Sequence, residues 1–341
     1  MVHVLVNVGF DRTVRNLMET CERQLDETLT VLDYPDVLTR RQLPAGTYVF
    51  TDFERCTRSD LAAINALWDQ LAASGRARLI NHPRRVTWRF PLLRALAARG
   101  LNDFTVYRPA DDLSTLRFPV FLRCEHDHGG VRTNLIHSHE TLQRAVAHMR
   151  RNLAWRNQIL IVEYGAAPDN DGLYRKYGAL LVEGRILPCQ LMASDGWFVK
   201  GRTRIVSKAI VDEEQRYVEE NPHAEVLRER FALANVEYGR IDYGFVNGRL
   251  QVYEINTNPT IVGGRAGARK TGDQRRPKRR LLTSHLVEAF RDMDAKSPAR
   301  SDAHAAIDVT PGAGPLPAWA YRGVRRAQSL LSLVTHRSGI R

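Results

Sequence analysis

The sequence has 341 residues, 43% of them hydrophobic, and a formal net charge of +12. A chain of this length exceeds the roughly 150 to 250 residues of one packed core, so we expect more than one domain. The composition is that of an ordinary globular protein and excludes a fibrous or disordered chain.

No segment approaches the roughly 20 uninterrupted apolar residues of a membrane-spanning helix, and the start, MVHVLVNVGFDR, lacks the pattern of a signal peptide. The four cysteines lie far apart without a C-x-x-C pair, which argues against a disulfide scaffold or a zinc site. We therefore expect a cytoplasmic protein.

The positive charge is concentrated at the end of the chain, where residues 264–341 contain 16 Lys and Arg against 6 Asp and Glu. Such a tail is a candidate contact for an anionic membrane surface or an acidic protein partner, and an amphipathic basic helix expected at 319–334 fits this interpretation. The alternative is a tail that is solvated or packs on its own protein. No specific nucleic-acid contact is expected.

Residues 1–82 are predicted to form a Rossmann-like lobe. Short apolar runs at 3–8, 46–51 and 77–80 predict buried strands, and helices are expected from 11 to about 26 and from 59 to 73. Strands that alternate with helices indicate a parallel sheet with covered faces. The pattern G-x-G-x-x-G of a dinucleotide-binding turn is absent.

Two further lobes are predicted at residues 83–183 and 184–293, followed by a basic linker and tail helix at 294–341. The first contains helices at 88–99 and 138–150, a glycine-containing loop at 124–133, and strands at 117–123, 158–164 and 173–182. The second contains helices at 212–220, 223–234 and 281–293, and strands at 185–193, 239–246 and 250–255.

The segment 238–264, YGRIDYGFVNGRLQVYEINTNPTIVGG, is the most informative. Asn247-Gly248 lies between two alternating runs and indicates a β-hairpin. A two-residue loop would leave Asp242 and Glu254 on opposite faces, whereas a three-residue loop, 247–249, sets them directly opposite each other with Asn256 on the same face. We expect the three-residue loop.

Opposed carboxylates repel each other unless a cation lies between them, and two acids plus a carboxamide are hard oxygen ligands. The pattern therefore predicts a Mg²⁺ site at Asp242, Glu254 and Asn256. The alternative is an ordinary ion pair between one of these acids and an arginine such as Arg240.

Arg240, Asp242 and the run 254–259, EINTNP, together resemble the metal-binding end of ATP-grasp enzymes, which include D-alanine ligases, glutathione synthetases and protein glutamate ligases. The resemblance extends more weakly over residues 1–293. It implies an α/β fold of ATP-grasp architecture, in which a Rossmann-like lobe precedes two α+β lobes that sandwich ATP.

The resemblance also implies ATP and two Mg²⁺ ions as cofactors, with Mn²⁺ as a substitute. Asp242 would bind one ion, Glu254 would bridge both, and Asn256 would complete the second, while Arg240 would sit beside the reacting acyl phosphate. Arg123 stands where the family usually has a phosphate-binding lysine, and its guanidinium keeps the charge with a planar donor geometry.

Further nucleotide contacts are implied for Glu163, Tyr164, Asp171, Gly129, Gly130 and Arg89. For Glu163 the alternative is a surface acid at a strand end, and for Arg89 it is a solvated helix start. Catalytic contacts are expected for Arg175 and for Arg202, which belongs to an alternating row with Lys200 and Arg204 that suits an anionic substrate or a γ-phosphate. The alternative for the row is an exposed loop.

The activity that the resemblance implies is an ATP- and Mg²⁺-dependent ligation of a carboxylate to an amine, or less often a thiol, through an acyl phosphate. Its substrates would be small-molecule or peptide carboxylates and amines, and homodimers are common among such enzymes. Two alternatives remain open: a kinase of a hydroxyl acceptor, and a nucleotide-binding module without chemistry.

Overall fold

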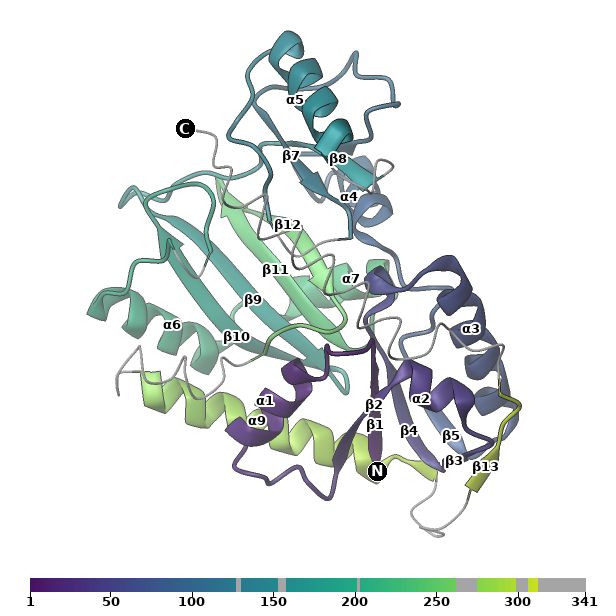
Figure 1. Cartoon of the computed structure of the whole chain (residues 1–341). Helices are drawn as coiled ribbons and strands as arrows, with labels where there is room; N and C mark the ends of the chain where they lie inside the picture. Colours follow the sequence, from purple (N-terminus) through teal and green to yellow (C-terminus); the bar gives the residue numbers. More distant parts are fainter. Residues whose placement is uncertain (127–129, 153–157, 201–202, 262–274, 299–305, 312–341) are drawn as a thin grey trace. The chain divides into compact units, whose positions relative to one another are not determined.

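The computed structural model describes residues 1–126, 130–152, 158–200, 203–261, 275–298 and 306–311. The predicted mixed α/β class is confirmed (Figure 1). The chain divides into two compact units, of which unit 1 comprises residues 1–84 with 290–341 and unit 2 comprises residues 85–289. The predicted boundaries at 82, 183 and 293 stay a proposal, and the predicted tail helix at 319–334 lies outside the described residues.

Unit 1 is built on a four-stranded parallel sheet, which confirms the predicted β/α alternation. Its strands pair in the order β2 (Leu29–Asp33), β1 (Val2–Val6), β4 (Gly46–Phe50) and β5 (Ala77–Ile80). The connecting helices are α1 (Arg12–Thr20), α2 (Tyr34–Thr39), the short η1 (Phe53–Arg55) and α3 (Arg58–Ala73). Helix α1 ends earlier than predicted, and β2 was missed because its run LTVLD is short and only partly buried.

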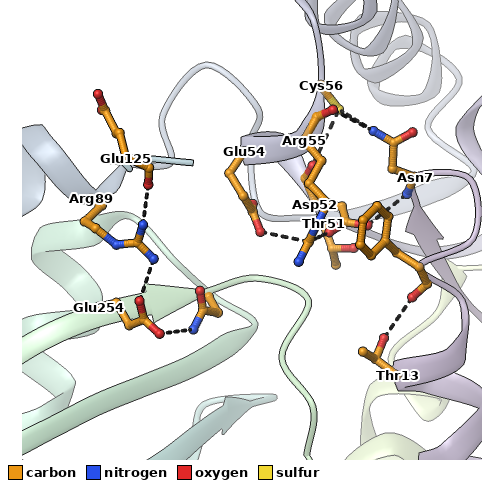
Figure 2. Close-up of polar contacts among 12 residues, drawn as sticks. Asn7, Thr13, Thr51, Asp52, Glu54, Arg55, Cys56, Arg89, Glu125 and Glu254 are labelled. Carbon is orange, nitrogen blue, oxygen red and sulfur yellow. Dashed lines mark hydrogen bonds and ion pairs between the residues drawn. The ribbon is translucent and has the colours of Figure 1, made fainter. Parts of the chain in front are cut away.

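The loops that follow the neighbouring strands β1 and β4 are hydrogen-bonded to each other (Figure 2). Asn7 follows β1, and its backbone N–H donates to the Asp52 carboxylate at 3.0 Å. The Asn7 amide donates to the carbonyl of Arg55 at 3.0 Å. Asp52 is fully buried and has φ of +65°, so the loop after β4 is held in a conformation that few residues adopt.

The predicted linker contains a short strand. Strand β13 (Ala306–Asp308) pairs antiparallel with β3 (Gln42–Pro44) in unit 1. The hydroxyl of Thr47 in β4 also bonds that of Ser297 at 3.1 Å. Residues late in the sequence therefore complete the unit that the first residues begin.

Unit 2 begins with helix α4 (Arg89–Ala98) and contains two antiparallel sheets. The smaller sheet has the order β6 (Val106–Tyr107), β8 (Ile159–Glu163), β7 (Val120–Cys124), and helix α5 (His139–Asn152) packs against it. The helix packs there because its apolar residues recur at helical spacing and meet the buried residues of both longer strands. This core includes Leu122, Leu142, Val146, Ile159 and Ile161.

The larger sheet of unit 2 has the order β10 (Arg185–Ser194), β9 (Tyr174–Val182), β11 (Gly239–Val246), β12 (Arg249–Asn256). Helix α6 (Lys208–Glu220) packs beside β10, and helix α7 (Ala224–Ala234) buries Leu227 and Phe231 in the core. Helix α9 (Arg276–Ala295) follows the sheet in sequence. Strand β9, which the prediction assigned to the preceding lobe, is hydrogen-bonded to both β10 and β11.

In the β11–β12 hairpin the predicted loop length is wrong, but the predicted pairing of Asp242 with Glu254 is observed. The loop has two residues, because Val246 pairs with Arg249, so the expected three-residue loop is wrong. Asn247 and Gly248 have φ of 50° and 75°, the positive values that the tight hairpin turn of an Asn-Gly pair requires. A β-bulge at Tyr253 then shifts the register, and Asp242 pairs with Glu254 after all.

Among the described residues, no helix is long and apolar enough to cross a membrane.

Unit 1 should lose stability in mild acid through His3. This residue lies in β1 against Tyr48, with ring centroids 4.7 Å apart, and burial lowers its pKa to about 4. As the pH falls, the unfolded chain binds the proton on His3 before the folded chain does. The free energy of unfolding is therefore highest above pH 6.5 and decreases by about 3 kcal/mol as the pH falls towards 4. Hydrogen exchange of the β1 and β4 amides between pH 7 and 4 measures this loss.

The variant His3→Leu should flatten this pH dependence, whereas His137→Gln, at an exposed position, should leave it unchanged. An equal pH slope in His3→Leu and in the unaltered protein would contradict the assignment.

Candidate active site

A pocket in unit 2 combines an aromatic wall with a charged end. It is lined by residues of β7, β8, β9, β11 and β12 and by the segment 197–200. The aromatic residues are Phe104, Phe121, Tyr164, Tyr174, Trp197, Phe198 and Tyr253. The charged residues include Arg123, Arg175, Lys176, Lys200, Asp242 and Glu254. The pocket therefore offers both aromatic rings and charged groups to one ligand.

Strand β7 contributes to both parts through its alternation. Val120, Leu122 and Cys124 are buried in the core, whereas Phe121 and Arg123 face the pocket. The Phe121 ring lies 5.0 Å from that of Trp197, centroid to centroid. One strand thus places an aromatic face next to a guanidinium.

The segment after β8, residues 164–167, lines the pocket. A side chain at Gly165 would clash with Phe104, because a Cβ there would lie 2.1 Å from a ring atom. The Tyr164 hydroxyl donates to that of Tyr174 at 3.2 Å, and the Tyr164 ring meets Trp197 edge-on at 5.9 Å. Close packing on both sides fixes the course of this segment.

The Glu163 carboxylate has a structural role. It is buried, so the alternative of a surface acid is wrong. It accepts hydrogen bonds from the backbone of Thr105 at 3.1 Å and of Arg117 at 2.9 Å, and it pairs with the Arg117 guanidinium at 2.6 Å. The side chain therefore serves to hold β8 against its neighbours.

The Asp242 carboxylate lies between two cations. Its Oδ1 pairs with Nε of Arg240 at 2.7 Å, and its Oδ2 pairs with Nζ of Lys176 at 3.1 Å. The Asp242 side chain is only 2% exposed. Burial works to lower the pKa of Arg240, but the charge of Asp242, the hydrogen bond to it and the charges of other neighbours such as Glu254 together keep that pKa above its ordinary value.

Glu254 occupies a similar position on the facing strand. Its Oε2 pairs with the guanidinium of Arg123 at 3.0 Å and with that of Arg89, and its Oε1 accepts from the Asn256 amide at 3.1 Å. Arg89 also donates to the carbonyl of Glu125, as Figure 2 shows. The Arg89 side chain is 8% exposed, so the alternative of a solvated helix start is wrong.

Four cationic side chains thus contact two carboxylates at this end of the pocket. The cations are Arg89, Arg123, Lys176 and Arg240. The alternative interpretation, an ion pair of Asp242 with Arg240, is observed. Within the described residues no group of three His, Cys, Asp or Glu side chains is arranged to hold a metal ion. The surplus of positive charge at this end of the pocket favours an anionic ligand.

Arg175 lines the pocket but is neutralised by acids. Its guanidinium pairs with Asp169 at 2.9 Å, with Asp171 at 2.7 Å and with Glu213 at 2.7 Å. The hydrogen bond from Arg175 lowers the pKa of Asp171 to about 2. Asp171 and Arg175, expected at the nucleotide and at the substrate respectively, are therefore bonded to each other beside the pocket.

The predicted phosphate loop is described in part. Gly130 has φ of +90°, and a Cβ there would lie 2.5 Å from Nζ of Lys200. The glycine thus lets the lysine approach the loop backbone at the pocket. Gly129 and Arg202 lie outside the described residues.

Sequence reasoning missed most of the aromatic wall and gave Lys176 no definite role. Phe121 is two residues before Arg123 on a strand, so its place on the same face followed from the alternation. Tyr253 gave no such signal, because only the bulge allows both Tyr253 and Glu254 to line the pocket. The Tyr253 hydroxyl lies next to Gly244, where a Cβ would be only 2.5 Å from the hydroxyl oxygen.

No family model matches the sequence, and no curated protein matches it. The structure is similar to the D-alanine–D-alanine ligase of Bacillus anthracis complexed with ATP, at 12% identity and a TM-score of 0.48 over 88% of this chain and 98% of that one. It is similar to the D-alanine–D-alanine ligase of Coxiella burnetii, at 13% identity and a TM-score of 0.48 over 87% of this chain and 95% of that one.

A RimK domain ATP-grasp protein from Sphaerobacter thermophilus is similar at 11% identity and a TM-score of 0.46, over 85% of this chain and 99% of that one. The name of this last protein includes ATP-grasp, the superfamily that the sequence motif resembles.

Replacing Asp242 by Asn should destabilise unit 2, because Lys176 and Arg240 would be left in a largely buried place without the carboxylate. We expect the free energy of unfolding, measured by urea denaturation, to fall by about 3 kcal/mol. The control Asp212→Asn breaks the exposed pair with Lys208 and should change it by less than about 1 kcal/mol. Equal effects of the two changes would refute the importance of the buried pairs.

Proposed function

We propose that this protein is an ATP- and Mg²⁺-dependent ligase that joins a carboxylate to an amine, or less often a thiol, through an acyl phosphate. The observation that carries the proposal is the pocket of unit 2, in which an aromatic wall leads to Asp242 and Glu254 and their four cationic partners. The EINTNP motif that resembles ATP-grasp enzymes forms the end of β12 and the residues after it.

The shape and charge of the pocket suit a nucleoside triphosphate. A flat heteroaromatic base can stack on rings such as those of Phe121 and Trp197, while the backbone after β8 offers it polar groups. The base would then be recognised by the backbone next to Tyr164, since the Glu163 carboxylate is already bonded to Arg117. Asp171 would contact the ribose only by giving up part of its bonding to Arg175.

Arg89 and Arg123 are the residues best placed to bind the phosphates. Both now share one oxygen of Glu254, and each guanidinium has several donors in a planar fork that suits phosphate oxygens. Lys200 and the backbone at Gly130 would cover the phosphates from the loop side. Gly129 would belong to the same loop, outside the described residues.

Asp242, Glu254 and Asn256 fit Mg²⁺ by their chemistry, because two carboxylates and a carboxamide supply hard oxygen ligands from one hairpin face. A bare Mg²⁺ ion would meet a surplus of positive charge here, so the ions would enter together with the triphosphate. When bound, they would neutralise the phosphate charge. Mn²⁺ has similar ligand preferences and would substitute.

The reaction would proceed in two displacements. A substrate carboxylate oxygen attacks the γ-phosphorus and the bond to ADP breaks, which gives an acyl phosphate. The amine nitrogen then attacks the acyl carbon, the bond to phosphate breaks, and the amine proton leaves to solvent. Arg240 would sit beside the acyl phosphate, with Arg175 and Arg202 as further contacts, and catalysis would consist mainly of positioning and charge neutralisation.

The test is ATP-dependent formation of a hydroxamate from a panel of carboxylic acids with hydroxylamine as the amine, together with ADP release. We expect both with the unaltered protein and a loss of at least about a hundredfold in Glu254→Gln, because a carboxylate that would hold the Mg²⁺ ions at the phosphates is removed. The control Glu225→Gln, at a side chain that is 97% exposed, should keep full activity.

Circular dichroism would verify that Glu254→Gln is folded under the assay conditions. Full activity of this variant would contradict the assignment of Glu254. ADP release with a phosphorylated alcohol and no hydroxamate would indicate a kinase, and ATP binding without turnover would indicate a module without chemistry.

A further inference from the structure

Glu254 pairs with the two arginines that the proposed function assigns to the nucleotide phosphates. Its Oε2 lies 3.0 Å from the guanidinium of Arg123 in β7 and also pairs with Arg89 of α4. None of the three side chains is more than 17% exposed, so water screens these pairs only weakly. One carboxylate oxygen of β12 therefore occupies guanidinium donors from two other elements.

Arg89 is anchored on its other side, so it keeps its place when Glu254 moves away. Its Nη1 donates to the backbone carbonyls of Cys124, at 3.3 Å, and of Glu125, while its Nη2 faces Glu254 (Figure 2). The backbone of Arg123 is fixed by the pairing of β7 with β8. Both guanidinium groups are thus held from behind, and the anion in front of them can be exchanged.

The three oxygen groups that fit Mg²⁺ all face donors. Asn256 presents its amide N–H to Oε1 of Glu254 at 3.1 Å. Asp242 is held by Lys176 at 3.1 Å and by Arg240 at 2.7 Å. A divalent cation that took Glu254 as a ligand would compete with these donors and release the guanidinium groups of α4 and β7.

We propose that Glu254 makes the site selective for the magnesium complex of the nucleotide and closes it to free nucleotide and to other uncomplexed polyphosphates. The inference rests on the proposed function, because it takes the phosphates to bind at Arg89 and Arg123. A free polyphosphate must displace a carboxylate that the chain holds in place, at an effective concentration on the order of millimolar or higher. A phosphate that arrives with Mg²⁺ brings a new partner for Glu254.

The size of the effect follows from the fraction of molecules in which Glu254 has released the two arginines. If this fraction is below about one tenth, the apparent dissociation constant of a free polyphosphate rises at least about tenfold. Mg²⁺ removes this competition, so the ion and the polyphosphate strengthen each other's binding by the same factor.

The experiment measures binding of a non-hydrolysable ATP analogue to the full chain by calorimetry, once with EDTA and once with excess Mg²⁺. The unaltered protein should bind the analogue at least about tenfold more weakly with EDTA. Glu254→Gln removes the competing charge and a metal ligand, so it should bind about tenfold more tightly with EDTA and more weakly with Mg²⁺. A merely structural role of Glu254 would weaken binding in both solutions.

Two further variants separate this competition from a general effect of charge. Glu288→Gln breaks an exposed pair with Arg185, outside the residues that line the pocket, and should bind the analogue as the unaltered protein does. In an Arg123→Gln background, Glu254→Gln should tighten binding with EDTA by a smaller factor, because one of the shared arginines is gone. Equal gains in both backgrounds would contradict the inference.

Unchanged or weaker binding of Glu254→Gln with EDTA would also overturn it. So would equal affinity of the unaltered protein with EDTA and with Mg²⁺, a result that requires no variant to fold. If Glu254→Gln gains affinity with EDTA but the unaltered protein forms no hydroxamate, the selectivity stands and the ligase proposal fails. Hydroxamate formation without that gain leads to the opposite conclusion, and no binding in either solution contradicts both proposals.

Discussion

The register of the β11–β12 hairpin is the constraint on which the candidate site depends. An Asn-Gly turn of two residues, continued without interruption, would send Asp242 and Glu254 to opposite faces of the sheet, because side chains alternate along a strand. One extra residue at Tyr253 reverses this outcome and sets the two carboxylates opposite each other. The bulge also turns the Tyr253 ring into the pocket beside Glu254.

The carboxylates and their cations hold each other in position before any ligand arrives. Asp242 pairs with Arg240 of its own strand and with Lys176 of β9, and Glu254 pairs with Arg89 of α4 and Arg123 of β7. Such a site is preorganised, and it is also a place where single replacements leave charges unpaired. The same groups that would bind phosphate therefore stabilise unit 2 in the absence of phosphate.

The sequence predicted most of the elements and the central pairing, but for a partly incorrect reason. Local patterns were sufficient for α3, for β1, β4 and β5 of the parallel sheet of unit 1, and for the hairpin, because those depend on neighbouring residues. The bulge was not predictable, since nothing in the sequence marks Tyr253 as the extra residue. The partners of Glu163 and Arg89 were also missed, because Arg117 and Glu254 are distant in sequence and only the tertiary fold brings them close.

The pairing of β13 with β3 has a consequence for how the protein is made. Unit 1 is discontinuous, and residues 85–289 must be translated before its closing strand emerges from the ribosome. At common elongation rates this interval lasts about 10 to 40 s. Strand β3 lacks its partner strand, and Thr47 lacks its contact with Ser297, throughout that interval. Unit 2 is contiguous and can mature first, so a slow or paused ribosome would expose the unfinished unit 1 to chaperones and proteases.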